Sequence, residues 1–282
     1  MLSQEEKAQQ FRALHERPSA FILPNPWDIG SARILAQLGF EALATTSAGY
    51  AFFHGTLDGR VGRDAMMAHI AELVRATDLA VSADLENGYG NAPELVAETI
   101  RMAAAQGLAG GSIEDATGNA AAPIYPIDLA KERIVAAAEA ARSLGFPFTL
   151  TARAENFLHG RPELKDTIER LQAYQEAGAD VLYAPGLTTR EEIAEVVRSV
   201  DRPVNVLAGI ADMRLSVAEL SQLGVKRIST GSALARASLG ALLLSAREMA
   251  QHGTFGFVDS AAANSRDVTR LLEAWRTSAK QN

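Results

Sequence analysis

The chain has 282 residues, of which 48% are hydrophobic and 22% charged, enough for one large core or two small domains. The formal net charge of −7 includes no basic block, which argues against a nucleic-acid partner. The absence of cysteine excludes disulfides, thiolate metal sites and cysteine nucleophiles. The N-terminal residues are polar, and the apolar stretch at residues 239–244 is too short to span a bilayer, so we expect a cytoplasmic protein without a membrane partner.

Short β-rich segments alternate with longer helical segments along the chain. Strands are predicted at residues 20–24, 42–46, 79–83, 110–113, 147–152, 180–183, 203–207 and 225–229. Helices are predicted at residues 3–16, 28–38, 63–76, 93–106, 128–144, 162–177, 189–200, 216–223, 232–251 and 260–279. This alternation requires parallel strands joined by crossover helices.

Eight such units close naturally into a (β/α)8 barrel of the TIM type, with extra helices at the C-terminus. We expect a single α/β domain over residues 1–282, with the barrel at about 20–250 and a helical extension at about 251–282. The alternative is an open doubly wound sheet. That fold usually carries a glycine-rich GxGxxG turn after its first strand, and the turn at Pro24, Asn25 and Pro26 has no such pattern.

Acidic residues follow the third and fourth predicted strands where each strand ends. Asp84 and Glu86 come directly after the third strand, and Glu114 and Asp115 end the fourth. Because the carboxyl ends of parallel strands lie on one side of a sheet, these carboxylates can converge. Such a set suits a hard divalent cation, Mg²⁺ or Mn²⁺, bound by oxygen with waters retained. The alternative is that each acid caps the next helix or forms an ion pair.

The other strand ends add polar and cationic groups. The second strand leads into Thr46, Ser47 and free backbone N–H groups at Ala48 and Gly49. The remaining strand-end residues are Arg153, Glu155, Asn156, Tyr183, Asn205, Ser229 and Thr230. An arginine beside several acids is typical of a site for a small anionic substrate, because arginine binds a carboxylate with two hydrogen bonds. No strand ends in lysine, which argues against a Schiff-base aldolase, and the histidines lack metal-ligand spacing.

Five segments together carry a family resemblance. They are TTSAG at residues 45–49, LDG at 57–59, ADLENGYG at 83–90, SIED at 112–115 and TARAEN at 151–156. At this spacing the chain resembles the isocitrate lyase/phosphoenolpyruvate mutase superfamily over most of residues 20–250. Members are Mg²⁺-dependent barrels that make or break C–C or P–C bonds beside an α-keto-acid carboxylate. They form or stabilise an enolate of the pyruvate type.

The resemblance implies roles for individual residues. Asp84 would be the direct ligand of Mg²⁺ or Mn²⁺, with Glu86, Glu114 and Asp58 holding metal-bound waters. The substrate would be bound by Ser47, Ala48, Gly49, Arg153, Glu155 and Asn205. Asp58, Arg153 and Tyr50 would be the catalytic residues.

Two departures from the family pattern limit the choice of reaction. The isocitrate and methylisocitrate lyases carry a catalytic cysteine after strand four, within K-[KR]-C-G-H. Here that loop reads ATGNAAAPIYPI, which argues against both activities. Glu86 also replaces the usual second aspartate of the metal site, although a glutamate still reaches a metal-bound water.

Three functions remain open. The first is a Mg²⁺-dependent lyase or decarboxylase acting on a small 2-oxo-dicarboxylate or related 2-hydroxy acid, such as oxaloacetate. The second is a P–C bond enzyme, either a phosphonopyruvate hydrolase or a phosphoenolpyruvate mutase. The third is a non-catalytic keto-acid-binding protein that kept the pocket.

Two further expectations concern mobility and assembly. Glycines at positions 55, 59 and 62 flank Asp58, so residues 50–62 are predicted to form a lid. The leucines of the helix at 232–251 spread over more than one face, which favours a partner subunit. The resemblance implies a homodimer or homotetramer with exchange of the C-terminal helices. The alternative is that residues 260–279 fold back over this helix.

Overall fold

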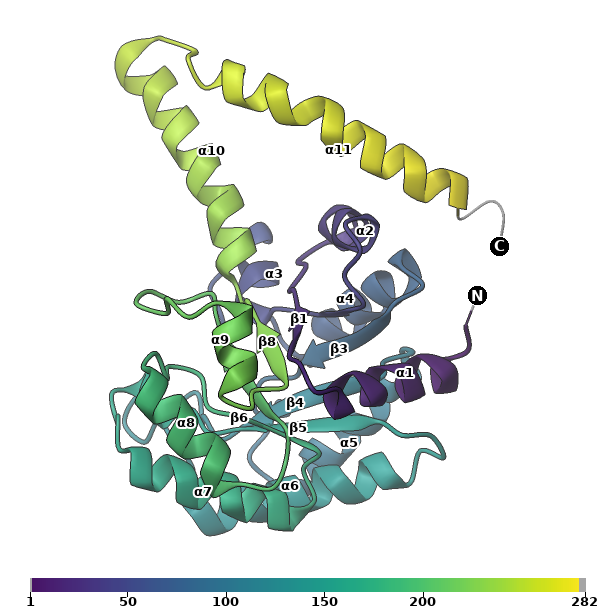
Figure 1. The fold of residues 1–282 in the computed structure, drawn as a ribbon, viewed down its shortest axis with the longest axis vertical. Coiled ribbons are helices and arrows are strands. Elements are labelled where there is room, and N and C mark those ends of the chain that lie inside the picture. The colour runs from purple at the N-terminus through teal and green to yellow at the C-terminus, as the bar shows by residue number, and fades with distance from the viewer. Residues whose placement is uncertain (1, 279–282) are drawn as a thin grey trace.

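Eight parallel strands form one sheet that curls into an almost closed barrel (Figure 1). The computed structural model describes residues 2–278. The strands are β1 (Phe21–Leu23), β2 (Ala42–Ala44), β3 (Ala80–Asp84), β4 (Gly110–Glu114), β5 (Thr149–Arg153), β6 (Val181–Tyr183), β7 (Val204–Leu207) and β8 (Arg227–Ser229). Their order is β1-β8-β7-β6-β5-β4-β3-β2. The Ala44 N–H donates to the Pro24 carbonyl at 3.1 Å, which joins the two ends of the sheet. The predicted (β/α)8 fold is therefore confirmed.

Helices alternate with the strands, most of them on the outside of the barrel. They are α1 (Gln4–Glu16), α2 (Ile29–Gln37), α3 (Ser47–Phe53), α4 (Arg63–Ala76), α5 (Pro93–Ala105), α6 (Ile127–Arg142), the 3₁₀ helix η1 (Asn156–His159), α7 (Leu164–Ala177), α8 (Arg190–Ser199), α9 (Val217–Gln222), α10 (Ala233–His252) and α11 (Val258–Ser278). Most predicted helices agree to within two residues. The last was predicted to end at Ala279, which lies outside the described residues.

One helix lies where the sequence predicted a loop. Helix α3 begins directly after β2, because the Thr46 hydroxyl caps it by accepting the Gly49 N–H at 3.1 Å. It runs to Phe53, so the first residues of the predicted lid are helical. The irregular part of that segment is therefore restricted to residues 54–62, which still include Asp58.

The two ends of the barrel interior differ in polarity. Helix α1 lies against the amino-terminal end, where Phe11, Leu14 and Phe21 are buried together. His15 packs edge-on against the ring of Phe21, with centroids 5.0 Å apart. The carboxyl-terminal end instead opens into a polar cavity. Apolar packing thus closes the amino-terminal end of the barrel, and the carboxyl-terminal end is open to ligands.

The C-terminal helices extend beyond the barrel (Figure 1). Helix α10 projects from the end of β8, and α11 runs back to pack against α2. There the Arg33 guanidinium lies 3.5 Å from the centre of the Trp275 ring. Within residues 2–278, none of the helices has the length and apolar character needed to cross a bilayer.

Candidate active site

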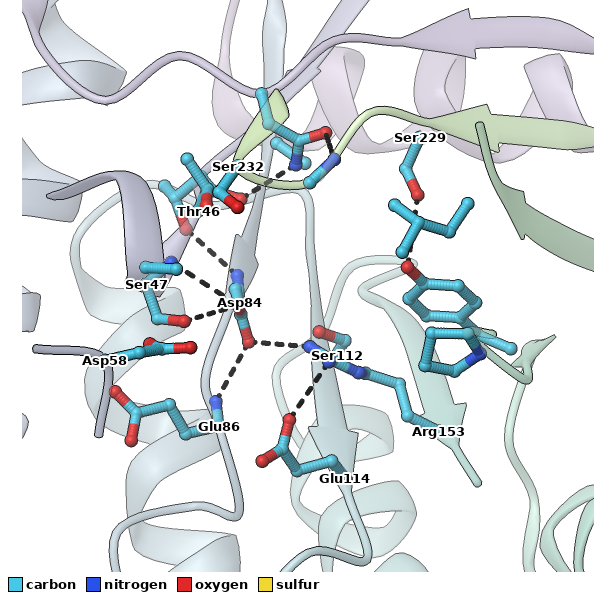
Figure 2. A pocket seen from close by; sticks show the side chains of 18 of the residues that line it. Thr46, Ser47, Asp58, Asp84, Glu86, Ser112, Glu114, Arg153, Ser229 and Ser232 are labelled. Carbon is cyan, nitrogen blue, oxygen red and sulfur yellow. Dashed lines mark hydrogen bonds and ion pairs between the residues drawn. The ribbon is translucent and has the colours of Figure 1, made fainter. Parts of the chain in front are cut away.

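A cavity of about 860 Å³ opens at the carboxyl ends of the strands, and each of the eight strands or the residue just after it contributes to its wall (Figure 2). On one side, β3, β4 and β5 present Asp84, Glu114 and Arg153. The three side chains that the sequence predicted to share one end of the barrel therefore do so. This places the candidate site where barrel enzymes carry theirs.

Asp84 is held at the centre of the site by hydrogen bonds to both carboxylate oxygens. Its Oδ2 accepts the Ser47 hydroxyl at 2.9 Å and the Ser47 N–H at 3.4 Å. Its Oδ1 accepts Arg153 Nη1 at 2.9 Å and the Glu86 N–H at 3.2 Å. The Asp84 N–H donates to Thr45 Oγ1 at 2.9 Å. The carboxylate is thus fixed in orientation by groups from the start of α3, the turn after β3 and the end of β5.

Arg153 joins three carboxylates. Its Nε lies 2.8 Å from Glu155 Oε1, its Nη1 2.9 Å from Asp84 and its Nη2 3.2 Å from Glu114 Oε2. Although burial disfavours the charged form, Glu155, Glu114 and Asp84 hold the pKa of Arg153 well above its usual value. A guanidinium has five N–H donors, so about two remain for another anion.

The cluster carries more negative than positive charge. Glu86 Oε1 is buried and has no hydrogen-bond partner within the described residues. Burial, followed by the charges of Asp84 and Asp58, raises the pKa of Glu86 to about 7. Burial also raises the pKa of Glu114, although Arg153 opposes this shift. An unpaired carboxylate oxygen beside other acids is the setting in which a cation is favourable.

The donor set therefore fits a hard divalent cation. Asp84, Glu86 and Glu114 offer oxygen atoms, as Mg²⁺ and Mn²⁺ prefer. Among the residues that the structure describes, no group of three or more acidic or histidine side chains is arranged to hold a metal ion by itself. This is compatible with a cation that keeps several of its waters, as Mg²⁺ does. Asp84 would hold such an ion, with Glu86 and Glu114 reached through water.

A strained turn after β3 places Glu86. Glu86 and Tyr89 have φ values of 49° and 59°, a left-handed region that non-glycine residues seldom adopt. The buried Arg133 holds this turn, because its Nη1 donates to the carbonyls of Gly90 at 2.6 Å and Asn91 at 2.5 Å. No local sequence pattern indicates this contact, since Arg133 lies far along the chain on α6.

Asp115 does not join the carboxylate cluster, which corrects the expectation that four acids converge. Its Oδ2 accepts the Tyr174 hydroxyl at 2.6 Å and Arg170 Nη1 at 3.1 Å. Its Oδ1 accepts the Glu155 N–H at 2.8 Å. Successive residues of a strand point to opposite faces, so Asp115 turns toward α7 where Glu114 turns inward.

The predicted substrate-binding and catalytic residues divide into two groups. Those lining the cavity are Ser47, Ala48, Asp58, Arg153, Glu155 and Asn205. Gly49 and Tyr50 are not among the lining residues. The Gly49 N–H is used in the helix cap, and a Cβ at Gly49 would lie 2.5 Å from Thr46 Cγ2. The Tyr50 ring stacks on His69, with centroids 3.8 Å apart. Both residues serve the packing of α3, because a helix turns successive residues away from the site.

The sequence analysis overlooked several polar residues in the wall. They include Ser82, Ser112, Arg227, Ser232 and Arg236. A signal for three of them was present: they lie two positions before Asp84, Glu114 and Ser229 in their strands, and strand side chains repeat their direction every two residues. Strand-end residues alone were considered, so this deeper layer was missed.

The segment after β4 forms a short closed hairpin. The Thr117 N–H donates to the Pro123 carbonyl at 2.9 Å, and the Tyr125 N–H to the Asp115 carbonyl at 2.9 Å. Thr117 and Gly118 line the cavity. Residues 116–124 include no cysteine, histidine, aspartate or glutamate. The hairpin therefore brings no thiol, imidazole or carboxyl group to the site.

Comparison of the sequence with known proteins identifies related families and enzymes. The sequence family described as phosphoenolpyruvate phosphomutase matches residues 11–250. A 2-methylisocitrate lyase of Bacillus subtilis (strain 168) is 30% identical over 217 residues, 74% of this chain and 69% of the relative. An oxaloacetate decarboxylase of Chromohalobacter salexigens is 28% identical over 251 residues, 82% of this chain and 81% of the relative.

Solved structures agree with the sequence comparison. A Burkholderia cenocepacia J2315 protein, described only as a lyase or mutase, superposes with a TM-score of 0.92 and 62% identity, covering 95% of this chain and 96% of that one. A 2,3-dimethylmalate lyase has a TM-score of 0.83 and 25% identity over the full length of both chains. A phosphonopyruvate hydrolase in complex with oxalate and Mg²⁺ shares the fold, at a TM-score of 0.83, 22% identity and 97% coverage of both chains. The chain therefore belongs to the phosphoenolpyruvate phosphomutase family, as a cysteine-less enzyme of the phosphoenolpyruvate mutase/isocitrate lyase superfamily.

Proposed function

We propose that the protein is a lyase that decarboxylates or cleaves a small 2-oxo-dicarboxylate or a related 2-hydroxy acid, with Mg²⁺ or Mn²⁺ as its cofactor. The observation that carries this proposal is the meeting of Asp84, Glu86 and Glu114 with Arg153 in one cavity. Carboxylates suit the cation, and the guanidinium suits a substrate carboxylate. The Mg²⁺ complex of a protein with the same fold supports the choice of cation.

The residues of the chain divide the work between binding and orientation. Arg153 has N–H donors to spare for a substrate carboxylate, and the Ser47 hydroxyl and the Ala48 backbone lie in the same wall. A bound divalent cation would supply Lewis-acid polarisation of the 2-oxo group. Glu155, whose N–H is fixed by Asp115, keeps the Arg153 side chain aligned. The start of α3 and the end of β5 thus bind the keto acid in one orientation.

The hairpin after β4 favours decarboxylation over cleavage. A lyase that releases a carbanion fragment needs a positioned acid to protonate it. Residues 116–124 provide none, and Asp58 belongs to the exposed segment after α3, where it lies beside Ser47 and Glu86 (Figure 2). Loss of CO₂ from a 2-oxo-dicarboxylate leaves an enolate that water can protonate. The oxaloacetate decarboxylase relative is consistent with this substrate class.

A two-substrate assay tests the proposal. With Mg²⁺ present, we expect pyruvate release from oxaloacetate at a rate well above the background with Mg²⁺ alone, and no phosphate from phosphonopyruvate. Phosphate release instead would replace the proposal with P–C bond hydrolysis. Tight keto-acid binding without either product would identify a binding protein that has lost turnover. Treatment with a chelator should abolish the decarboxylation, and added Mn²⁺ should restore it.

We also propose that the protein is a homodimer or homotetramer that pairs through α10. Leu242, Leu243 and Leu244 are 63%, 50% and 68% exposed, which is unfavourable for neighbouring leucines in water. A closed symmetric assembly would cover them. We expect light scattering to give a multimer at low micromolar concentration, and Leu242→Glu with Leu244→Glu to give the monomer. Gln251→Glu on the same helix is the control for added charge. A monomeric wild type would refute the proposal.

A further inference from the structure

Arg227 places a second guanidinium inside the barrel. It is the first residue of β8, is only 4% exposed, and is among the residues that line the cavity. Burial lowers the pKa of Arg227 to about 10, which still leaves it cationic at neutral pH. The cavity therefore contains a buried positive charge that the predicted chemistry of the site does not use.

The partners of this guanidinium are all neutral. Its Nε donates to Asn205 Oδ1 at 2.9 Å, and its Nη2 donates to Thr151 Oγ1 at 3.0 Å. Its Nη1 lies 3.4 Å from His15 Nε2. Within residues 2–278 no carboxylate forms an ion pair with Arg227, whereas Arg153 has three.

The histidine partner is itself uncharged. His15 Nδ1 lies 2.9 Å from the Phe11 carbonyl, so Nδ1 carries the proton and Nε2 is left as an acceptor for Arg227. Burial and the charge of Arg227 lower the pKa of His15 to about 3. His15 therefore solvates the guanidinium without changing the local charge.

Burying a charge without a counter-ion has a large desolvation free energy, so buried charges in proteins are normally paired. Three of the five N–H donors of Arg227 are used by its neutral partners, which leaves about two. The groups beside it in the wall are also suited to an anion. The Asn205 amide nitrogen donates one N–H to Ser229 Oγ at 2.9 Å and has a second N–H, and the Ser229 hydroxyl lies 3.5 Å from Tyr183 Oη, a long contact that an anion can replace. An anion that enters the cavity would satisfy this charge.

We propose that the deep end of the cavity is an anion subsite in which Arg227 binds a second anionic group of the substrate, with Asn205 and Ser229 beside it. The inference rests on the proposed function for the other end of the ligand, a 2-oxo or 2-hydroxy carboxylate at Arg153. It assigns the second charge of a dianionic substrate, a distal carboxylate or phosphonate, to Arg227, and it requires that charge in a 2-hydroxy acid substrate as well. Monocarboxylates such as pyruvate and lactate would fill only the Arg153 end.

Two ligand pairs test the subsite by calorimetry in the presence of Mg²⁺. Malate differs from lactate by a distal carboxylate, and phosphonopyruvate differs from pyruvate by a distal phosphonate. In at least one pair, we expect the wild type to bind the dianion at least about 10-fold more tightly than the monoanion of the same pair. Arg227→Met should remove that preference and change the affinity for the monoanion by less than about 3-fold. Arg227→Lys, which keeps the charge, should retain most of the preference.

Stability measurements separate ligand binding from a structural role. Removing an uncompensated buried charge should leave the melting temperature of Arg227→Met unchanged or raised. Arg198→Met, on the outer surface of α8, is the control for the loss of one positive charge. Equal weakening of dianion and monoanion by Arg227→Met would show a structural brace and overturn the subsite, as would a wild type that discriminates in neither pair. Discrimination only in the phosphonate pair would keep the subsite and refute the decarboxylase proposal.

Discussion

Two buried arginines face the same cavity in opposite electrostatic settings. Arg153, on the β3–β5 side, lies within 2.8–3.2 Å of Glu155, Asp84 and Glu114. Arg227, on β8, has neutral hydrogen-bond partners throughout the part of the chain that the structure describes. We call the first set the acidic wall, comprising Asp84, Glu86, Glu114 and Glu155, and the second the basic floor, comprising Arg227 with Asn205.

The difference in counter-ions indicates a different role for each arginine. Counter-ions around Arg153 lock its geometry, so this arginine orients protein groups as well as a substrate carboxylate. No carboxylate of residues 2–278 forms an ion pair with the basic floor, so its charge is available to an anion from outside the protein. The acidic wall conversely has an excess of negative charge that a cation would balance. The cavity is thus prepared for two ligands of opposite charge.

Among changes to the acidic wall, we expect substitution of Asp84 to reduce activity and metal binding most. Asp84→Asn keeps the shape but removes the charge, and we expect kcat for keto-acid turnover to fall by about 10³-fold or more. Mg²⁺ affinity measured by calorimetry should weaken in parallel. Asp201→Asn, on the protein surface, is the matched control and should behave as the wild type. Unchanged metal affinity and activity in Asp84→Asn would contradict a cation site at the acidic wall.

Arg153→Lys tests the orienting role of the first arginine. A lysine keeps the positive charge but cannot reach Glu155, Asp84 and Glu114 in the fixed geometry of a guanidinium. We expect kcat/KM to fall by about 100-fold, with an effect on monoanions and dianions alike. This pattern contrasts with Arg227→Met, which should affect dianions selectively. A selective loss of dianion binding in Arg153→Lys would contradict the distinct roles assigned to the two arginines.

Asn205→Ala tests whether the basic floor acts as a unit. The Asn205 amide accepts from Arg227 Nε at 2.9 Å and donates to Ser229 Oγ at 2.9 Å, so it joins the guanidinium to the wall. Its removal frees Arg227 to move, and we expect about 10-fold weaker binding of the preferred dianion. Lactate and pyruvate affinities should be nearly constant in the same titrations. A larger loss than in Arg227→Met would make Asn205 the principal anion ligand.

The sequence predicted every residue of the acidic wall, whereas in the basic floor it predicted Asn205 but not Arg227. Asp84, Glu114 and Arg153 stand at strand ends, and the strand–helix alternation that defines the barrel also defines those ends. Asp115 was misplaced because the alternation of strand side chains was not applied to adjacent residues. Arg227 begins a three-residue strand and shares a strand face with Ser229, but tertiary packing is needed to show that this face lines the cavity so deep in the barrel.

The segment after β2 shows a different limit. A loop was expected after Thr46, yet a helix starts there, because its cap is a local hydrogen bond that follows the strand without a linker. Gly49 and Tyr50 consequently belong to a helix that packs on its neighbours. Their side-chain directions depend on the helix start to within one residue, since each helical residue rotates the direction by about 100°. Sequence patterns do not fix element boundaries that finely.

The smallest expected effect concerns the stability of the basic floor at low pH. His15 is buried, and its pKa is about 3 when folded against about 6.5 when unfolded. Between these values the unfolded chain binds a proton that the folded protein excludes, so stability falls as the pH is lowered from 7 to 5. For this one group the loss is about 1–2 kcal/mol. Arg227 strengthens the effect, because a protonated His15 would face a second cation.

His15→Gln isolates this contribution. A glutamine offers an amide N–H to the Phe11 carbonyl and an amide oxygen to Arg227, without a titrating group. Denaturant unfolding at pH 7 and pH 5 should therefore show a smaller loss of stability in this variant than in the wild type. Some loss should persist, because burial lowers the pKa of His69 to about 4. His252→Gln, exposed at the end of α10, is the control and should keep the full wild-type loss. An identical loss in His15→Gln and the wild type would mean that His15 does not stay neutral beside Arg227, and that the floor carries a different charge from the one proposed.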